Sequence, residues 1–331
     1  MIQKKTKAPV EKPVAIADAP APSQTKRSRP KRQQIAKSDS VASPDVLESK
    51  PFRLMQVTDE QSRLPDGIER FTPNQELARG ALPMFEALKV VSKTETCDQS
   101  GLWGLLPFDF DERTLMSASE FREVVDASRV KHPEIEWYYC SANPELEALY
   151  HNPWRSPEVQ YGGFVGLART FLRASRIGDL MIDTMVHSRL FATGNLVVAT
   201  PARWHDYLNF VDEALAEARH NLDAKTCRLL FEEKPQPGRL TMLALIVARM
   251  PSIYLAKHQE KMRHYKVALP KQEQGLNAHL RILRDLKDRA LDQSDYQLAR
   301  SWSAYRGLYL AHVFGREWIL KHINAITPGN K

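Results

Sequence analysis

The sequence predicts an α/β fold, with a mixed or parallel sheet flanked by helices and followed by a helical C-terminal region. Up to about residue 235, short segments typical of strands alternate with capped, amphipathic segments typical of helices. Beyond about residue 240 the strand patterns stop, and only apolar residues at helical spacing continue. We therefore expect an N-terminal tail (1–50), an α/β domain (51–235) and a helical region (236–331) packed on that domain.

Four segments have the patterns of strands. The segment 53–58 alternates apolar and polar side chains, and 135–140 is rich in aromatic residues. The apolar run 102–106 is typical of a buried strand, and 196–199 forms a further one. We expect these four segments to build the sheet.

Helix starts are marked by capping residues. Thr72 is expected to cap a helix that has Pro73 at its first position and Gln75 in a capping box, with a kink at Pro83. A second capping box runs from Ser117 to Glu120. Further helices are expected to begin at 143–144 and 200–201, to cover 164–178, and to include 242–246, 276–286 and 298–313.

The formal charge of +7 is concentrated in the first 50 residues. They hold eleven Lys or Arg and five Asp or Glu, which leaves only +1 for the rest of the chain. Their Pro, Ala, Ser and Lys content predicts disorder. The basic cluster 26–32 suggests contact with a membrane surface or a partner protein, or simply a solubilising tail. Because the body is nearly neutral, nucleic acid is disfavoured as a partner.

The composition indicates a cytoplasmic protein, with peripheral attachment to the inner membrane through the tail as a further option. The opening residues 1–7 are not followed by the apolar region of a signal peptide, and no apolar run reaches membrane-spanning length. Cys97, Cys140 and Cys227 are sparse and odd in number, which argues against a disulfide framework or a zinc site.

The first candidate site follows the run 102–106, which leads into Asp109-Phe110-Asp111. Two carboxylates at the end of a strand can hold Mn²⁺ or Mg²⁺, and the metal can neutralise a diphosphate leaving group. Sites for such ligands commonly lie at the carboxyl ends of strands in α/β folds. The alternative is a solvated turn in which Asp109 or Asp111 caps a helix.

A second cluster contains Tyr150, His151, Asn152, Trp154 and Arg155. Trp and Tyr stack on sugar rings, while Asn, His and Arg bond hydroxyls or phosphates. The cluster therefore suggests a site for a polar ligand. It is equally the pattern of a helix C-terminus with a packed Trp and a capping Asn.

A third cluster lies before the segment 196–199. Asn195 is placed to bond a sugar hydroxyl, and His187 is a candidate general base. A lone histidine is, alternatively, a structural or surface residue. The common motifs GxGxxG, Walker A, HExxH and GxSxG do not occur in the sequence.

Together these segments resemble a family of bacterial proteins encoded among surface-polysaccharide and lipopolysaccharide genes and taken to be glycosyltransferases or glycosyltransferase-like. The resemblance spans about 52–320. Its landmarks are the segments 103–114, 147–154, 163–164, 195–204 and 276–290. The sequence departs from the family at Gly194-Asn195-Leu196, where Ser-Asn-Tyr is usual, and at 161–163, where His-Pro-Gly is common. It also lacks the family's Lys between aromatic residues at the acidic turn.

The resemblance implies a GT-A-like fold and transfer of a sugar from a nucleotide-sugar donor to a surface polysaccharide or other glycan acceptor. In that hypothesis Asp109 and Asp111 hold the metal, while Asn152, Trp154, Arg155 and Asn195 bind donor or sugar and His187 acts as base. The alternative is a non-catalytic scaffold or interaction subunit of a polysaccharide-assembly complex, which the absence of a clear catalytic motif favours. The sequence leaves open whether the protein is an enzyme.

Overall fold

The computed structural model describes residues 51–59, 63–98, 101–233 and 239–327, so the predicted tail 1–50 lies outside the described residues. The described part of residues 48–331 is one compact α/β unit. Its strands are β1 (Phe52–Val57), β2 (Ile68–Phe71), β3 (Leu102–Leu106), β4 (Trp137–Tyr139), β5 (Val197–Ala199) and β6 (His264–Lys266).

Helices cover most of the remaining described chain. Before β5 they are α1 (Gln75–Arg79), α2 (Pro83–Ser92), α3 (Glu95–Asp98), α4 (Phe110–Thr114), α5 (Ala118–Lys131), α6 (Pro144–Leu149), α7 (Phe164–Ala174) and α8 (Leu180–Asp183), with 3-10 turns η1 (Ser156–Val159) and η2 (Ser188–Leu190). After β5 they are α9 (Pro201–Asn221), α10 (Ala224–Phe231), α11 (Met242–Val247), α12 (Met250–His258), α13 (Pro270–Gly275), α14 (Ala278–Asp292), α15 (Tyr296–Phe314), α16 (Arg316–Lys321) and α17 (Ile323–Ile326).

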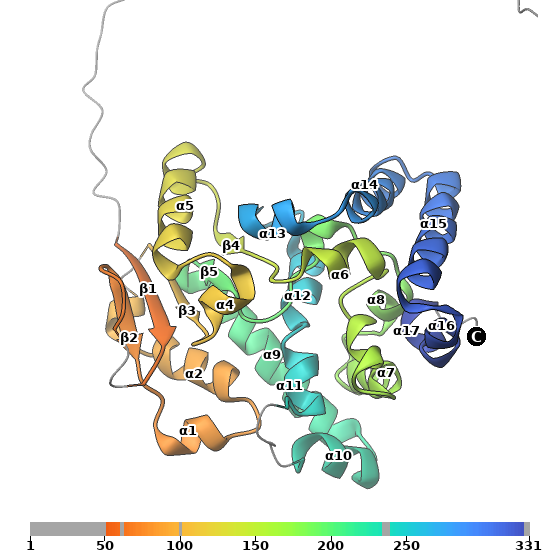
Figure 1. Cartoon of the computed structure of the whole chain (residues 1–331). Helices are drawn as coiled ribbons and strands as arrows, with labels where there is room; N and C mark the ends of the chain where they lie inside the picture. Colours follow the sequence, from red (N-terminus) through yellow and green to blue (C-terminus); the bar gives the residue numbers. More distant parts are fainter. Residues whose placement is uncertain (1–50, 60–62, 99–100, 234–238, 328–331) are drawn as a thin grey trace, which may run out of the picture. The chain divides into compact units, whose positions relative to one another are not determined.

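The strands form one mixed sheet in the order β2-β1-β3-β5-β4-β6 (Figure 1). Strand β5 is antiparallel to both of its neighbours, and the other strands all run in one direction. The four predicted strands are confirmed. The edge strands β2 and β6 were not predicted, and β6 contradicts the expectation that strands end near residue 240.

A glycine in the central strand allows β5 to pair closely. Gly104 of β3 lies opposite Val198 of β5. A Cβ atom at position 104 would lie 2.6 Å from Cγ2 of Val198 and 2.8 Å from the carbonyl oxygen of Val197. The second of these atoms belongs to the backbone and cannot rotate away, so only glycine fits without moving the strand.

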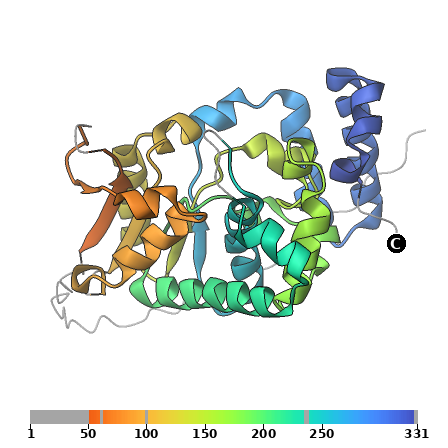
Figure 2. The same cartoon turned by 90° about the horizontal axis from the view of Figure 1, so that it is seen from below.

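Apolar side chains of the sheet alternate between two cores, as the period of a strand requires. One face carries Trp103 and Trp137 and packs on α2, α7, α9, α11 and α12. The helix α9, long and green in Figure 2, contacts α2, α7 and α12 on this side. The other face carries Leu106 and Tyr138 and packs on α4 and α5.

An aromatic cluster fills the first of these cores. The rings of Trp103 and Trp204 are stacked with centroids 4.7 Å apart, and Trp137 lies 5.6 Å from Trp204. Tyr207 and Tyr254 meet edge to face at 5.3 Å. The indole Nε1 of Trp204 donates to the carbonyl oxygen of Trp103 at 2.7 Å, which ties α9 to the central strand.

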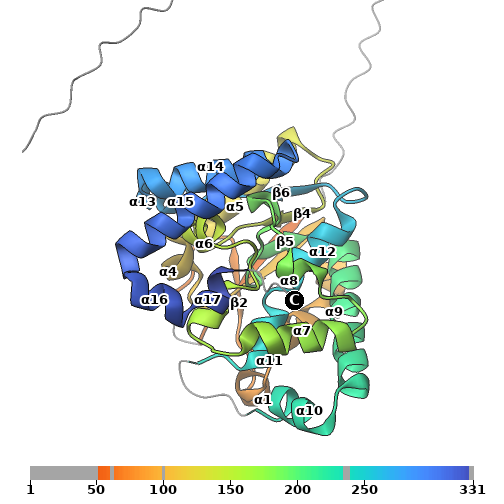
Figure 3. The same cartoon turned by 90° about the vertical axis from the view of Figure 1, so that its right-hand side faces the viewer.

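The C-terminal helices form a third core with α6. Figure 3 shows α14 and α15 side by side, followed by α16 and α17. The strand β6, which lies beyond residue 235, joins the same sheet as β1–β5 and belongs to the same compact unit. Among the residues that the structure describes, no helix has the length and hydropathy to cross a membrane.

Capping explains where the helices begin. The expected start at Thr72 is wrong, because the side chain of Asn74 accepts from the Leu77 amide and caps α1. The helix also ends near Gly80, and Pro83 begins α2 where a kink was expected. The capping box of Ser117 and Glu120 is confirmed at the start of α5.

We expect Gly104→Ala to lower the free energy of unfolding by about 3 kcal/mol, because the methyl group overpacks a backbone contact. Chemical denaturation followed by circular dichroism measures the change. Gly307→Ala is the matched control: it lies in α15 with no atom within 4 Å of its would-be Cβ. It should raise stability by about 0.5 to 1 kcal/mol, since alanine favours a helix. Equal stability of both variants would contradict this account of β5 pairing.

Candidate functional site

One edge of the sheet gathers the chain segments that can build a site. The carboxyl ends of β1, β3, β4 and β6 meet there, together with the amino end of β5, because β5 alone runs the other way. Two cavities lie along this edge, and they share no lining residue. We call them the apolar cavity, beside β1 and β3, and the polar cavity, beside β4 and β6.

The apolar cavity has a volume of about 490 Å³. Its walls come from the end of β1, the segment after β3, the turn before β5, and helices α2 and α11. Three polar side chains interrupt the apolar lining, namely Asp109, Arg113 and Asn195. Phe108 also lines it and is 74% exposed, which leaves an aromatic face open to a ligand. The structure thus brings Asp109 and Asn195, predicted separately, to one cavity.

Asp109 stands immediately before α4 but makes no capping hydrogen bond. Its Oδ1 lies 3.6 Å from an Nη atom of Arg113, so the carboxylate faces a cation one turn along the helix. Asp111 lies in the first turn of α4 and is not among the residues lining the apolar cavity. Partial burial raises the pKa of the Asp111 carboxyl. Hydrogen bonds from the Ala118 backbone and the Gln56 side chain act in the opposite direction and lower that pKa.

The two carboxylates do not form a complete metal cage. Within the described ranges, no group of three or more His, Cys, Asp or Glu side chains is arranged to hold a metal ion. Mg²⁺ commonly binds through one or two carboxylates together with the phosphates of its substrate.

The turn before β5 presents Asn195 to the apolar cavity. Gly194 has a φ of 76°, in the left-handed region that favours glycine, and its amide donates to the Ala248 carbonyl at 2.7 Å. Asn195 is 9% exposed, and among the described residues its Oδ1 has no hydrogen-bond partner. A buried acceptor without a partner is costly, so this oxygen is suited to a ligand hydroxyl or amine.

The second predicted cluster lies inside the protein and away from both cavities. The amide nitrogen of Asn152 donates to the carbonyls of Ile182 and Thr184, and its Oδ1 accepts from the Trp154 amide. Trp154 is fully buried and offers no exposed face for stacking. These contacts are those of residues that hold the fold together.

Arg155 anchors the C-terminal segment. Its guanidinium donates to the carbonyl oxygens of Ile182, Asn324 and Thr327, and pairs with Asp183. Burial lowers the pKa of Arg155, while the Asp183 carboxylate opposes that effect. Every described contact of this side chain is made to the protein itself.

His187 caps the turn η2, where its Nδ1 accepts from the Arg189 amide at 3.0 Å. Asp288 lies 3.6 Å from Nδ1, and Asp292 lies 3.5 Å from Nε2. His187 lines neither of the two cavities, although the next residue, Ser188, lines the polar one. The structure does not bring it to Asp109 or Asn195.

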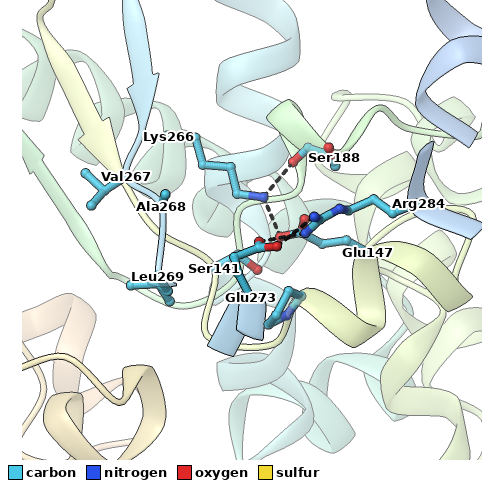
Figure 4. A pocket seen from close by; sticks show the side chains of 10 residues that line it. Ser141, Glu147, Ser188, Lys266, Val267, Ala268, Leu269, Glu273 and Arg284 are labelled. Atoms are coloured by element: carbon cyan, nitrogen blue, oxygen red, sulfur yellow. Dashed lines mark hydrogen bonds and ion pairs between the residues drawn. The ribbon is translucent and has the colours of Figure 1, made fainter. Parts of the chain in front are cut away.

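The polar cavity, of about 260 Å³, was not predicted (Figure 4). Its charged side chains form two pairs: Glu147 with Lys266, and Glu273 with Arg284. Ser141 lies at the end of β4 beside the first pair. Sequence patterns missed this cavity because its charged residues belong to separate elements. Lys266 ends an edge strand that was not predicted, and Glu273 and Arg284 lie on two different helices, so no local motif contains these three residues. The only local signal was Glu147, an acidic residue on the buried face of a short helix.

If Asn152 is structural, Asn152→Ala should lower the free energy of unfolding by about 2 kcal/mol, since the Ile182 and Thr184 carbonyls each lose one donor and the Trp154 amide loses its acceptor. Urea denaturation measures the change. Asn209→Ala, an exposed position on α9, is the matched control and should change stability by less than about 0.5 kcal/mol. Similar values for the two variants would contradict a structural role for Asn152.

His151 should make the fold sensitive to mild acid. Burial, with Arg306, lowers its pKa from 6.5 to about 2. The unfolded chain therefore binds a proton near pH 6.5 while the folded chain does not, so stability falls as the pH drops below that value. Between pH 7 and pH 5 we expect His151 to contribute a loss of about 2 kcal/mol. Denaturation at both pH values in His151→Gln should show that loss removed; an unchanged pH dependence would contradict it.

Comparison with known proteins gave no match among protein-family models, curated proteins or solved structures. The resemblance to glycosyltransferase-like proteins therefore stays a prediction. Function has to be inferred from the chemistry of the two cavities and their place in the sheet.

Proposed function

We propose that the protein is glycosyltransferase-like, of the GT-A kind, and transfers a sugar from a nucleotide-sugar donor to a glycan acceptor. The observation that carries the proposal is the grouping of Asp109, Arg113 and Asn195 in one cavity at the carboxyl edge of the sheet. Ligands of α/β folds commonly bind at this edge. A sheet with one antiparallel strand among parallel ones is compatible with a GT-A-like fold.

The cavity offers each part of such a donor a suitable contact. Phe108 presents an aromatic face on which a base or sugar ring can stack. Arg113 supplies a guanidinium that can bond phosphate oxygens, and Asp109 is the carboxylate for a metal that bridges the diphosphate. Bound there, Mn²⁺ or Mg²⁺ would neutralise the charge of the leaving diphosphate. Asn195 would accept from a sugar hydroxyl.

The alternative is a non-catalytic subunit of a polysaccharide-assembly complex. It is favoured by large apolar side chains left exposed on the C-terminal helices, among them Leu308 at 71% and Leu320 at 64%. Apolar side chains of this kind mark a surface that meets a partner where they form one contiguous patch. Under this alternative no nucleotide changes thermal stability, and binding to anionic vesicles or partner proteins is lost when residues 1–50 are deleted.

The two functions separate in a thermal-shift experiment. Uridine, guanosine, cytidine and thymidine diphosphates, each with Mn²⁺, are added to the full chain. A ligand at about 100 times its Kd stabilises the native state by about 2.7 kcal/mol, so one nucleotide should raise Tm by several degrees. Asp109→Asn should abolish most of the shift, and Asn195→Leu should reduce the shift given by the whole nucleotide sugar.

The matched control is Asp126→Asn, a partly exposed aspartate on α5 that pairs with Arg122 and Arg129 and lies outside the apolar cavity. It should retain the full shift. Asp111→Asn tests whether the second carboxylate contributes. If none of the four diphosphates shifts Tm, or if the control loses the shift as Asp109→Asn does, the donor site proposed here is wrong.

A further inference from the structure

We propose that the polar cavity is a second binding site, which takes a neutral polyhydroxylated ligand of about one sugar ring. It is distinct from the donor site, because the two cavities share no lining residue. The inference goes beyond the proposed function and requires no nucleotide. Its evidence is a pair of buried polar atoms, a balanced set of charges and the size of the cavity.

Two buried side chains that line the cavity have polar atoms without partners. Glu147 is fully buried, and its Oε1 accepts from the ammonium of Lys266. Its Oε2 has no hydrogen-bond partner in the part of the chain that the structure describes, and neither has Oγ of Ser141. An unpaired buried carboxylate oxygen is among the more costly groups in a folded protein. Oε2 of Glu147 and Oγ of Ser141 are almost fully covered, so each side chain has to turn toward the cavity for a ligand hydroxyl to satisfy it.

The charges around the cavity balance. Two carboxylates, Glu147 and Glu273, face two cations, Lys266 and Arg284. The guanidinium of Arg284 binds Glu273 through two bonds of 2.6 Å each. For a charged ligand, each side chain of opposite charge in the cavity is already in an ion pair with another side chain of the protein. A neutral ligand is therefore favoured over a phosphate or an amine.

The remaining donors and acceptors match vicinal hydroxyls. Lys266 has three N–H groups, two of which are used by Glu147 and the Ser188 carbonyl. Its third N–H can donate a hydrogen bond to the oxygen of a ligand hydroxyl. The same hydroxyl can donate its own hydrogen bond to Oε2 of Glu147. Figure 4 shows Ser141, Glu147 and Lys266 converging on one space. Ser141 can bond an adjacent hydroxyl as donor or acceptor.

The size of the cavity limits the ligand. A water molecule occupies about 30 Å³ in the liquid, so 260 Å³ has room for about nine groups of that size. This fits one sugar ring or a similar polyol whose far side meets solvent. It is too small for an oligosaccharide to enter as a whole.

The test is ligand-observed NMR on the full chain with four probes: D-glucose, D-galactose, D-mannose and N-acetyl-D-glucosamine. We expect at least one to bind with a Kd on the order of 1 to 10 mM. Glu147→Gln should weaken that probe about tenfold or more, because the carboxylate acceptor is lost, and Ser141→Ala should weaken it severalfold. Ser141→Ala keeps the test valid if Glu147→Gln does not fold, as judged by circular dichroism.

The matched control is Ser128→Ala, a buried serine on α5 that does not line the cavity; it should leave binding unchanged. Asp109→Asn should also leave sugar binding intact, whether or not nucleoside diphosphates raise the Tm of the protein. The inference is overturned if no probe binds at about 50 mM, if the cavity variants bind as the wild type does, or if Asp109→Asn removes binding. A nucleotide test that fails while sugar binding persists would reject the donor site alone.

Discussion

The close pairing of β5 with β3 is the constraint on which the site depends. Without a side chain at Gly104, β5 can lie antiparallel between two parallel strands. Its reversed direction brings its amino end, and with it Gly194 and Asn195, to the edge where the parallel strands end. Asp109 reaches that edge from β3, so two polar side chains about 90 residues apart in the chain line one cavity, and Gly104 allows the strands that lead to them to pair closely.

Buried cations bonded to backbone carbonyls hold the C-terminal helices in place. Lys287 donates to the carbonyls of Glu147 and Tyr150, and Arg306 to those of Leu149 and Ile326. Burial lowers the pKa of Lys287 to about 8 and that of Arg306 to about 10. The carbonyl oxygens take the place of water around these charges. With Arg155, they join the C-terminal helices to α6 and to the segment that follows it.

The central strands and several helix starts could be predicted because their signals are local: apolar runs for β3 and β5, and the capping box of Ser117 and Glu120 for α5. The edge strands could not, because β2 and β6 are short and charged or polar residues make up much of each one. Asp109 and Asn195 were proposed as site residues from their positions beside strands. Asn152 and Arg155 carry the same chemical groups as ligand-binding residues, and only tertiary contacts reveal that backbone carbonyls use them. The polar cavity is built in part by β6. Because β6 was not predicted, the residues that line this cavity could not be grouped from the sequence.

The aromatic cluster on α9 gives the protein an internal optical reporter. Trp103 and Trp204 are stacked closely enough for their indole transitions to couple, and Trp137 lies beside them. Excited states shared between such rings produce strong near-ultraviolet circular dichroism that disappears once the rings separate. Trp302 stands apart, packed between α15 and α6. The coupled signal therefore follows the docking of α9 on the sheet and not that of the C-terminal helices, which hold Trp302 and Trp318.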